Sequence, residues 1–108
     1  MEFSEIKKRI FSLLSSPQPA AEDWSDVGVH LEALWADAQR EMRAKELTAN
    51  RKFKEIRHLE GIKSRADAEI EWLASEEYQS FKEAEDTVEE IQRWITRATN
   101  ESVARRNK

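Results

Sequence analysis

The chain has 108 residues, a net charge of −4 at pH 7, 37% charged residues, and only two glycines and two prolines. A chain of this length forms one domain with a modest core, and this composition is typical of long solvated helices rather than of an α/β core or a disordered tail. The absence of cysteine excludes disulfides and thiolate chemistry, and no apolar run approaches the roughly 18 residues that span a bilayer. We expect one helical domain over residues 1–108, a cytoplasmic location and no membrane segment.

The first expected helix covers about residues 3–14. Its apolar residues follow the three- and four-residue steps of an amphipathic helix, namely Phe3, Ile6, Ile10, Leu13 and Leu14. The Ser-Ser-Pro-Gln-Pro segment at residues 15–19 ends this helix, because proline fixes φ and disfavours helix in the residue before it. Pro19 suits the first turn of a second helix, with Glu22 and Asp23 near its positive end.

The second expected helix runs from about residue 20 to residue 74. Its apolar residues keep one helical phase over this length: Trp24, Val27, Leu31, Leu34, Trp35, Ala38, Met42, Ala49, Phe53, Ile56, Leu59, Ala66, Ile70 and Leu73. Asn50 could end the helix, but the basic run at residues 51–54 follows it, and a new helix start favours acids. Gly61 costs about 1 kcal/mol relative to alanine, and we interpret it as a close helix approach or a slight bend.

The third expected helix covers about residues 76–104. Ser75 is a suitable N-cap, followed by Glu76 and Glu77 in the first turn. The apolar seam of this helix consists of Phe81, Ala84, Val88, Ile91, Ile95, Ala98 and Ser102. A reversal at Ser75 would place Ile70 and Leu73 against Phe81 and Ala84, Leu59 against Ile91, and Ile56 against Ile95. Because no glycine marks this turn, one uninterrupted helix to the C-terminus remains the alternative. The sequence thus predicts an all-α fold, a short N-terminal helix plus a long antiparallel coiled-coil-like helical hairpin.

The charges alternate in blocks along the chain. Residues 66–90 hold ten carboxylates against Lys82 alone, whereas residues 38–65 and 91–108 are basic. In the predicted hairpin, one end becomes an acidic tip made of Asp67, Glu69, Glu71, Glu76, Glu77, Glu83, Glu85 and Asp86. The other end gathers the bases. The tip is either a solvated surface that maintains solubility or a functional surface.

The sequence carries no pattern that predicts catalysis or a cofactor. Glu55 and His58 have the Glu-x-x-His spacing of di-iron helix bundles, but such sites need a second Glu-x-x-His motif. The other histidine, His30, has no glutamate three residues before it. Neither a phosphate-binding glycine loop, a His-Glu-x-x-His motif nor a nucleophile elbow is present. We expect no enzyme activity, no cofactor, no metal and no small-molecule substrate.

Direct nucleic-acid binding is the weaker of two possible roles for the charges. The basic run at residues 51–54 includes Phe53, as nucleic-acid binders can, but Phe53 is better explained as a core residue. The sequence pI of about 5.3 also weakens phosphate affinity. The acidic tip suits the opposite role, in which its carboxylates imitate a phosphate backbone and occupy the basic groove of a nucleic-acid-binding protein.

The four tryptophans divide into two pairs. Trp24 and Trp35 lie on or beside the long apolar stripe and are expected in the core. Trp72 and Trp94 flank the predicted hairpin seam, so we expect them to contact a partner or a second copy.

The predicted helix lengths indicate a homodimer. The first helix is too short, and the returning helix ends too early, to cover the middle of the long helix. Four apolar residues there would lack a cover in the monomer and form the oligomer interface: Leu34, Trp35, Ala38 and Met42. A bend near Gly28 or Asn50 that closes the monomer on itself is the alternative.

Two stretches, residues 66–71 and 75–82, resemble small helical accessory proteins encoded by phages and prophages. The resemblance implies an accessory or host-directed role. The apolar stripes and the exposed tryptophans predict a non-enzymatic helical interaction or assembly protein that acts through them. The alternative is a phage-type inhibitor, for example an anti-CRISPR or anti-defence protein, whose acidic tip mimics nucleic acid.

Overall fold

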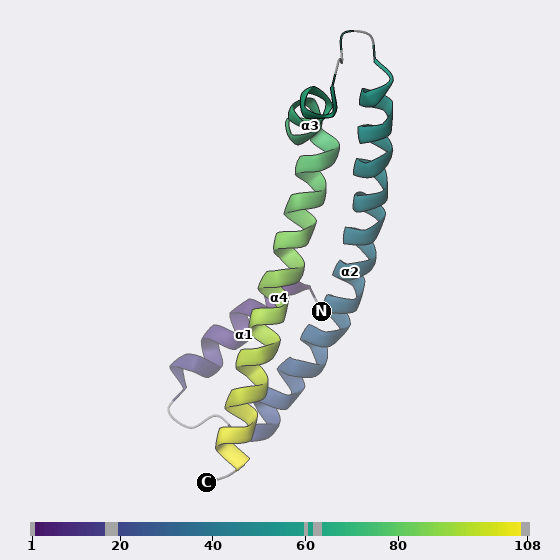
Figure 1. The fold of residues 1–108 in the computed structure, drawn as a ribbon. Helices are drawn as coiled ribbons and strands as arrows, with labels where there is room; N and C mark the ends of the chain where they lie inside the picture. Colours follow the sequence, from purple (N-terminus) through teal and green to yellow (C-terminus); the bar gives the residue numbers. More distant parts are fainter. Residues whose placement is uncertain (1, 17–19, 60, 62–63, 107–108) are drawn as a thin grey trace. The chain divides into compact units, whose positions relative to one another are not determined.

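The computed structural model describes residues 2–16, 20–59, 61 and 64–106, and within them the chain forms α-helices only (Figure 1). The helices are α1 (Phe3–Ser15), α2 (Ala21–Arg57), α3 (Arg65–Leu73) and α4 (Glu76–Arg106). The predicted all-α fold, with a short N-terminal helix followed by long antiparallel helices, is confirmed. The break between the first two helices is also where the sequence predicts it, although Pro17 and Pro19 lie outside the described residues.

The chain separates into two compact units. Unit 1 comprises residues 1–37 and 89–108, and unit 2 comprises residues 38–88. Both α2 and α4 contribute to each unit, and within each unit their segments run antiparallel (Figure 1). The single domain expected over residues 1–108 stays a prediction.

In unit 1, α1 packs through its predicted apolar stripe. Ile6 and Ile10 are fully buried, as are residues of α2 and α4 that complete this core: Trp24, Val27, Leu31, Ile91 and Ala98. Each buried Ile, Val or Leu side chain of this core contributes about 1.5–3 kcal/mol when it leaves water. Two ion pairs hold α1 at its edges, one from Lys7 to Glu90 at 2.8 Å and one from Arg9 to Asp26 at 2.6 Å.

In unit 2, small and aromatic residues join three helices. The buried residues are Ala49, Ile56, Ala68, Ala84 and Val88. Around them lie four half-buried rings, Phe53 on α2, Trp72 on α3, and Tyr78 and Phe81 on α4. Neighbouring rings meet edge-on or tilted, with centroids 4.6–6.4 Å apart. Alanine at three of the five buried positions lets the helices approach closely, and the half-buried rings add apolar contact around them.

The predicted single helix over residues 20–74 is wrong. It is two helices, because α2 ends at Arg57 and the chain reverses before α3 begins at Arg65. Gly61 has φ +88°, a left-handed conformation that glycine adopts without steric cost. Ser64 then caps α3 by accepting a hydrogen bond from the Asp67 N–H at 3.1 Å. The chain reversal therefore lies between α2 and α3 and not at Ser75.

Ser75 has a different part in the structure. Its hydroxyl oxygen accepts a hydrogen bond from the Tyr78 N–H at 3.2 Å and donates to the Trp72 carbonyl oxygen at 2.6 Å. The predicted N-cap at Ser75 is thus confirmed, but it joins α3 to α4 at a short bend. The side chain of Gln79 reinforces this bend by donating to the Leu73 carbonyl oxygen at 2.8 Å.

The moved turn also changes the predicted pairing of α2 with α4. Ile70 and Leu73 are exposed instead of lying against Phe81 and Ala84. Ile91 is buried in the core of unit 1 and Ile95 belongs to the same unit, so their predicted pairing with Leu59 and Ile56 of unit 2 is wrong. The register is instead set by contacts such as the 2.8 Å hydrogen bond between the Ser25 and Ser102 hydroxyls.

Candidate partner-binding surfaces

The inner face of α3 is fixed by Trp72. The indole N–H donates a 2.7 Å hydrogen bond to the Ala49 carbonyl oxygen, and the ring packs against Phe53 at 5.2 Å and Tyr78 at 4.6 Å between centroids. One turn earlier, Ala68 is fully buried. Residues 68 and 72 are four apart and share one face of the helix, so that face is held against the rest of unit 2.

The outer face of α3 is apolar and open. Ala66, Ile70 and Leu73, here called the α3 stripe, follow one another at steps of four and three on the side away from Ala68 and Trp72. Ile70 is 67% exposed and Leu73 is 41% exposed. A helix anchored on one face and apolar on the other is the arrangement expected of a surface that a partner covers.

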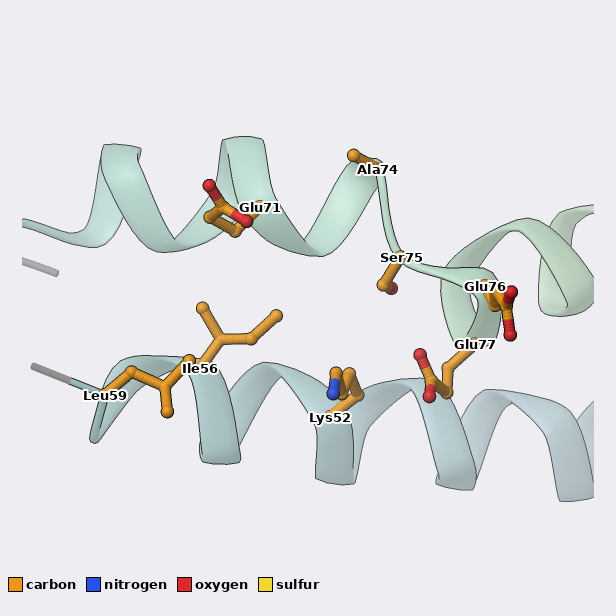
Figure 2. A pocket seen from close by; sticks show the side chains of 8 residues that line it. All are labelled: Lys52, Ile56, Leu59, Glu71, Ala74, Ser75, Glu76 and Glu77. Atoms are coloured by element: carbon orange, nitrogen blue, oxygen red, sulfur yellow. The ribbon is translucent and has the colours of Figure 1, made fainter. Parts of the chain in front are cut away.

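Beside α3 lies an open groove of about 410 Å³ between α2 and the bend (Figure 2). Eight residues line it: Lys52, Ile56, Leu59, Glu71, Ala74, Ser75, Glu76 and Glu77. Ile56 and Leu59 form its apolar part, and Leu59 is 58% exposed. Three carboxylates and one ammonium group surround them. The groove offers an apolar contact with charged edges.

The acidic tip residues are on the surface of unit 2, but bases accompany them. Asp67, Glu69 and Glu71 lie on α3 and the other five on α4; six of the eight are exposed, and Glu77 and Glu85 are half-buried. Lys52 lines one groove with Glu71, Glu76 and Glu77, and Lys45 lines two smaller cavities with acids of α4. Lys82 forms an ion pair with Glu85, and this hydrogen bond raises the pKa of Lys82.

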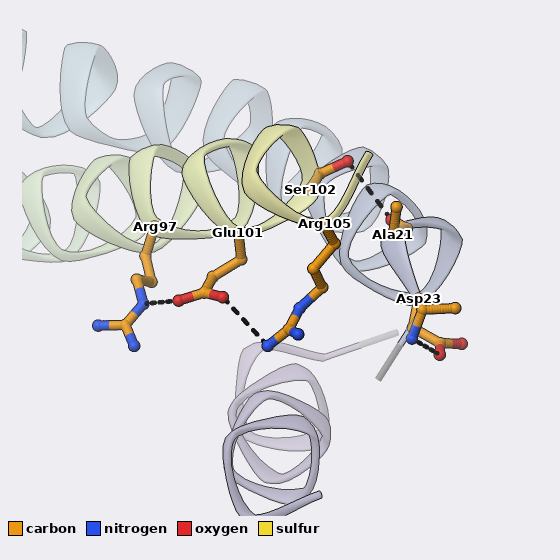
Figure 3. Close-up of polar contacts among 7 residues, drawn as sticks. Ala21, Asp23, Arg97, Glu101, Ser102 and Arg105 are labelled. Carbon is orange, nitrogen blue, oxygen red and sulfur yellow. Dashed lines mark hydrogen bonds and ion pairs between the residues drawn. The ribbon is translucent and has the colours of Figure 1, made fainter. Parts of the chain in front are cut away.

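The predicted separation into an acidic tip and a basic end is therefore wrong. The bases among residues 51–57 of α2 belong to the same unit as the acids. The arginines of α4 are in unit 1, where Arg97 and Arg105 both bind Glu101, at 3.1 Å and 3.2 Å (Figure 3). The pairing error has one cause: the turn lies before α3, so the acids return alongside the bases that precede them.

A second groove lies in unit 1, between α2 and the last turns of α4. It has a volume of about 220 Å³ and is lined by Trp24, Ser25, Gly28, Val29, Glu32, Ala98, Thr99, Ser102, Val103 and Arg106, here called the unit 1 groove. The buried Ser102 forms hydrogen bonds with the Ser25 hydroxyl and with the Ala21 carbonyl oxygen. Figure 3 shows the bond to Ala21. Val29 and Val103 are 65% and 50% exposed.

The four tryptophans differ in how deeply they are buried. Trp24 is fully buried, which confirms its core position, and Trp35 is half-buried. Trp72 is half-buried with the contacts given above, and Trp94 is half-buried with its ring edge-on to Phe11 at 5.9 Å. Both predicted contact tryptophans thus already use ring surface within their own units, and their contact with a partner stays a prediction.

The four residues of the predicted oligomer interface are half-buried. Leu34 and Trp35 belong to unit 1, and Ala38 and Met42 to unit 2. Ala38 lines a cavity with Ala84 and Thr87 of α4, so α4 extends further along α2 than the predicted helix lengths allow. The argument that this part of α2 has no cover is wrong, although the dimer itself stays a prediction.

Within the part of the chain that the structure describes, no group of three or more His, Cys, Asp or Glu side chains is arranged to hold a metal ion. His58 is exposed, and Glu55 faces Lys52 at 3.9 Å. None of the described helices is long and apolar enough to cross a membrane.

Five of the exposed apolar residues were not predicted as surface residues from the sequence. Ile70, Leu73 and Leu59 were expected in the hairpin seam, and Val29 and Val103 were given no role. Gly61, three residues before Ser64 in a Gly-x-x-Ser pattern, is the signal that could have revealed the turn. No protein-family model, curated protein or solved structure matches this chain.

Proposed function

We propose that this chain is a non-enzymatic interaction protein whose α3 stripe binds a protein partner. The observation that carries the proposal is the exposure of Ile70 and Leu73 on a helix whose opposite face is fixed by Trp72. Covering an exposed Ile or Leu stabilises a complex by up to about 1.5–3 kcal/mol each. Such residues contribute more to binding affinity on a rigid helix than on a mobile loop, because less conformational entropy is lost on binding.

Charges around the stripe favour selectivity. Glu69 lies within the stripe's turn of α3 and is exposed, and Glu71 and Glu76 line the neighbouring groove. Carboxylates at the rim of an apolar contact steer a partner that carries bases at matching positions and reject one that carries acids. The partner we propose is therefore a protein with an apolar contact surface and basic edges.

The inhibitor that mimics nucleic acid is the second candidate. Its support is that six of the eight acidic tip carboxylates are exposed. Lys45, Lys52 and Lys82 stand close to these acids and reduce the local negative potential, so we place this role second. Reversing Glu83 and Asp86 to lysine separates the two, because these exposed tip carboxylates line neither the α3 stripe nor the groove beside it. Binding by an inhibitor would weaken and depend strongly on salt, whereas binding through the stripe survives.

Affinity purification from cells of the encoding organism tests the proposal. The bait is the wild-type chain, and the test variant carries Ile70→Asp and Leu73→Asp. The matched control carries Asn50→Asp and Thr87→Asp, which place the same charge on exposed helical positions elsewhere in unit 2. We expect a protein that co-purifies with the wild type and the control and is lost from the test variant, while circular dichroism shows equal helix content. Equal recovery with all three baits would refute the proposal.

A further inference from the structure

We infer that the unit 1 groove is a contact surface between two copies of this chain. This inference is independent of the proposed function, because it concerns unit 1 and a second copy rather than the α3 stripe and another protein. The two walls of the groove have the same spacing. Residues 24, 25, 28, 29 and 32 form the α2 wall, and residues 98, 99, 102, 103 and 106 form the α4 wall.

Gly28 is the first observation that points to a covering helix. It lies within α2, where glycine costs about 1 kcal/mol relative to alanine. No atom outside its local backbone lies within 4 Å of the position where a Cβ would stand, so packing within the chain does not require glycine there. A glycine facing open space in a helical groove instead permits the backbone of a second helix to approach closely, as small residues do at helix contacts.

The exposed valines supply the apolar part of the contact. Val29 and Val103 stand on opposite walls and are both at least half-exposed. A helix placed over Gly28 would lie between them. Ala98 and Thr99 add short side chains to the α4 wall, towards the end of the groove where Glu32 lies.

The charges at the two ends of the groove determine which partner can bind there. Glu32 lines one end of the groove and Arg106 the other, and both are exposed. Arg106 donates one hydrogen bond to the Ser25 hydroxyl at 2.9 Å and has further N–H groups to offer. Glu32 has no ion-pair partner among the described residues. A partner groove needs a base opposite Glu32 and an acid opposite Arg106.

The same groove of a second copy, rotated by 180°, satisfies that requirement. A twofold axis that lies in the contact plane, perpendicular to the length of the groove and through its centre, brings Arg106 of each copy to the end of the groove where Glu32 of the other copy lies. The contact is then isologous, with two Glu–Arg pairs around the paired valines and glycines. Because ten residues a side is below the 20–30 of a standard interface, we expect a weak dimer, with a Kd of about 10 μM to 1 mM.

Sedimentation equilibrium with charge variants tests the inference. Glu32→Arg leaves two bases and Arg106→Glu two acids in each groove, so each variant alone should dimerise at least about tenfold more weakly than the wild type. An equimolar mixture of the two variants should restore dimerisation, because one copy then supplies both bases and the other both acids. Restoration in the mixture also shows that both variants are folded.

Gly28→Leu provides a test that does not depend on charge. The added side chain enters open space in the monomer and improves helix propensity, so the melting temperature should stay equal or rise. Dimerisation should be lost, because the leucine fills the path of the second helix. Ala33→Leu, an exposed position of the same helix outside the groove, is the matched control and should dimerise as the wild type does.

Three results would each overturn the inference. The first is a wild type that is monomeric up to about 1 mM. The second is dimerisation that the charge variants and Gly28→Leu leave unchanged. The third is a dimer that is lost only when Trp35→Glu and Met42→Glu are combined, since that result assigns the contact to the middle of α2. Loss of the α3 stripe partner would not affect any of these measurements, so failure of the proposed function is distinguishable.

Discussion

The indole N–H of Trp72 donates a 2.7 Å hydrogen bond to the backbone carbonyl oxygen of Ala49, 23 residues earlier in the chain. This contact joins α3 to α2 on the far side of the chain reversal. Because Trp72 also touches rings on α2 and α4, it connects all three helices of unit 2. The outward direction of the α3 stripe follows from this attachment.

We predict that Trp72 is a main stabilising residue of unit 2. Trp72→Phe keeps an aromatic ring but removes the hydrogen bond, and it should lower the free energy of unfolding by about 1 kcal/mol. Trp72→Ala also removes the packing and should cost about 3 kcal/mol, a value reduced from that of a fully buried ring because Trp72 is half-buried. Urea unfolding followed by circular dichroism measures both. Variants within about 0.5 kcal/mol of the wild type would show that α3 is not anchored in this way.

The two glycines should respond in opposite directions to alanine. Gly61 has a positive φ, so Gly61→Ala should cost about 1–2 kcal/mol. Gly28 is helical with open space around it, so Gly28→Ala should raise the stability of the monomer by up to about 1 kcal/mol. Thermal unfolding at low protein concentration compares the pair directly. If Gly61→Ala is neutral, the left-handed turn before α3 is not the conformation in solution.

The start of α3 depends on one capping side chain. Ser64→Ala removes the hydroxyl that accepts the Asp67 N–H, and it should cost about 1 kcal/mol. Ser12→Ala serves as the control, because Ser12 is an exposed serine inside α1 where alanine is the better helix former. Hydrogen exchange should show faster exchange of the first amides of α3 in the Ser64 variant only. Unchanged exchange there would place the start of α3 elsewhere.

Sequence periodicity predicted the helices and most of the buried residues, but it could not predict the reversal. Ile6, Ile10, Trp24, Val27 and Leu31 are buried as their spacing indicates. Periodicity describes which residues share a phase and not the direction in which the chain runs. The apolar residues after the turn happen to continue the helical phase of those before it. The reversal therefore left no mark on the apolar pattern of the sequence.

The candidate surfaces were missed for the same reason. A residue in phase with a stripe is core only if another element covers it. Once the chain turns at Gly61, Trp72 faces inward and Ile70, two positions away, faces solvent. Predicting this required the local turn chemistry of Gly61 and Ser64, which outweighs a continuous pattern.

The core of unit 1 should depend most on Trp24. Its side chain is fully buried, and its indole N–H has no hydrogen-bond partner among the described residues. Trp24→Ala should cost about 3–5 kcal/mol because it leaves a large cavity. Trp24→Phe should cost clearly less, since it keeps a ring and removes a buried N–H that has no partner. Equal losses for the two variants in urea unfolding would contradict this account of the core.

Photo-cross-linking from the α3 stripe tests the central claim most directly. Benzoylphenylalanine is placed at position 70 in one variant and at position 50, an exposed polar position of α2, in another. Both are expressed in cells of the encoding organism and irradiated. We predict a discrete cross-linked adduct to another protein from position 70 and none from position 50. The absence of an adduct from position 70, or the same adducts from both positions, would contradict the claim that the α3 stripe binds a protein partner.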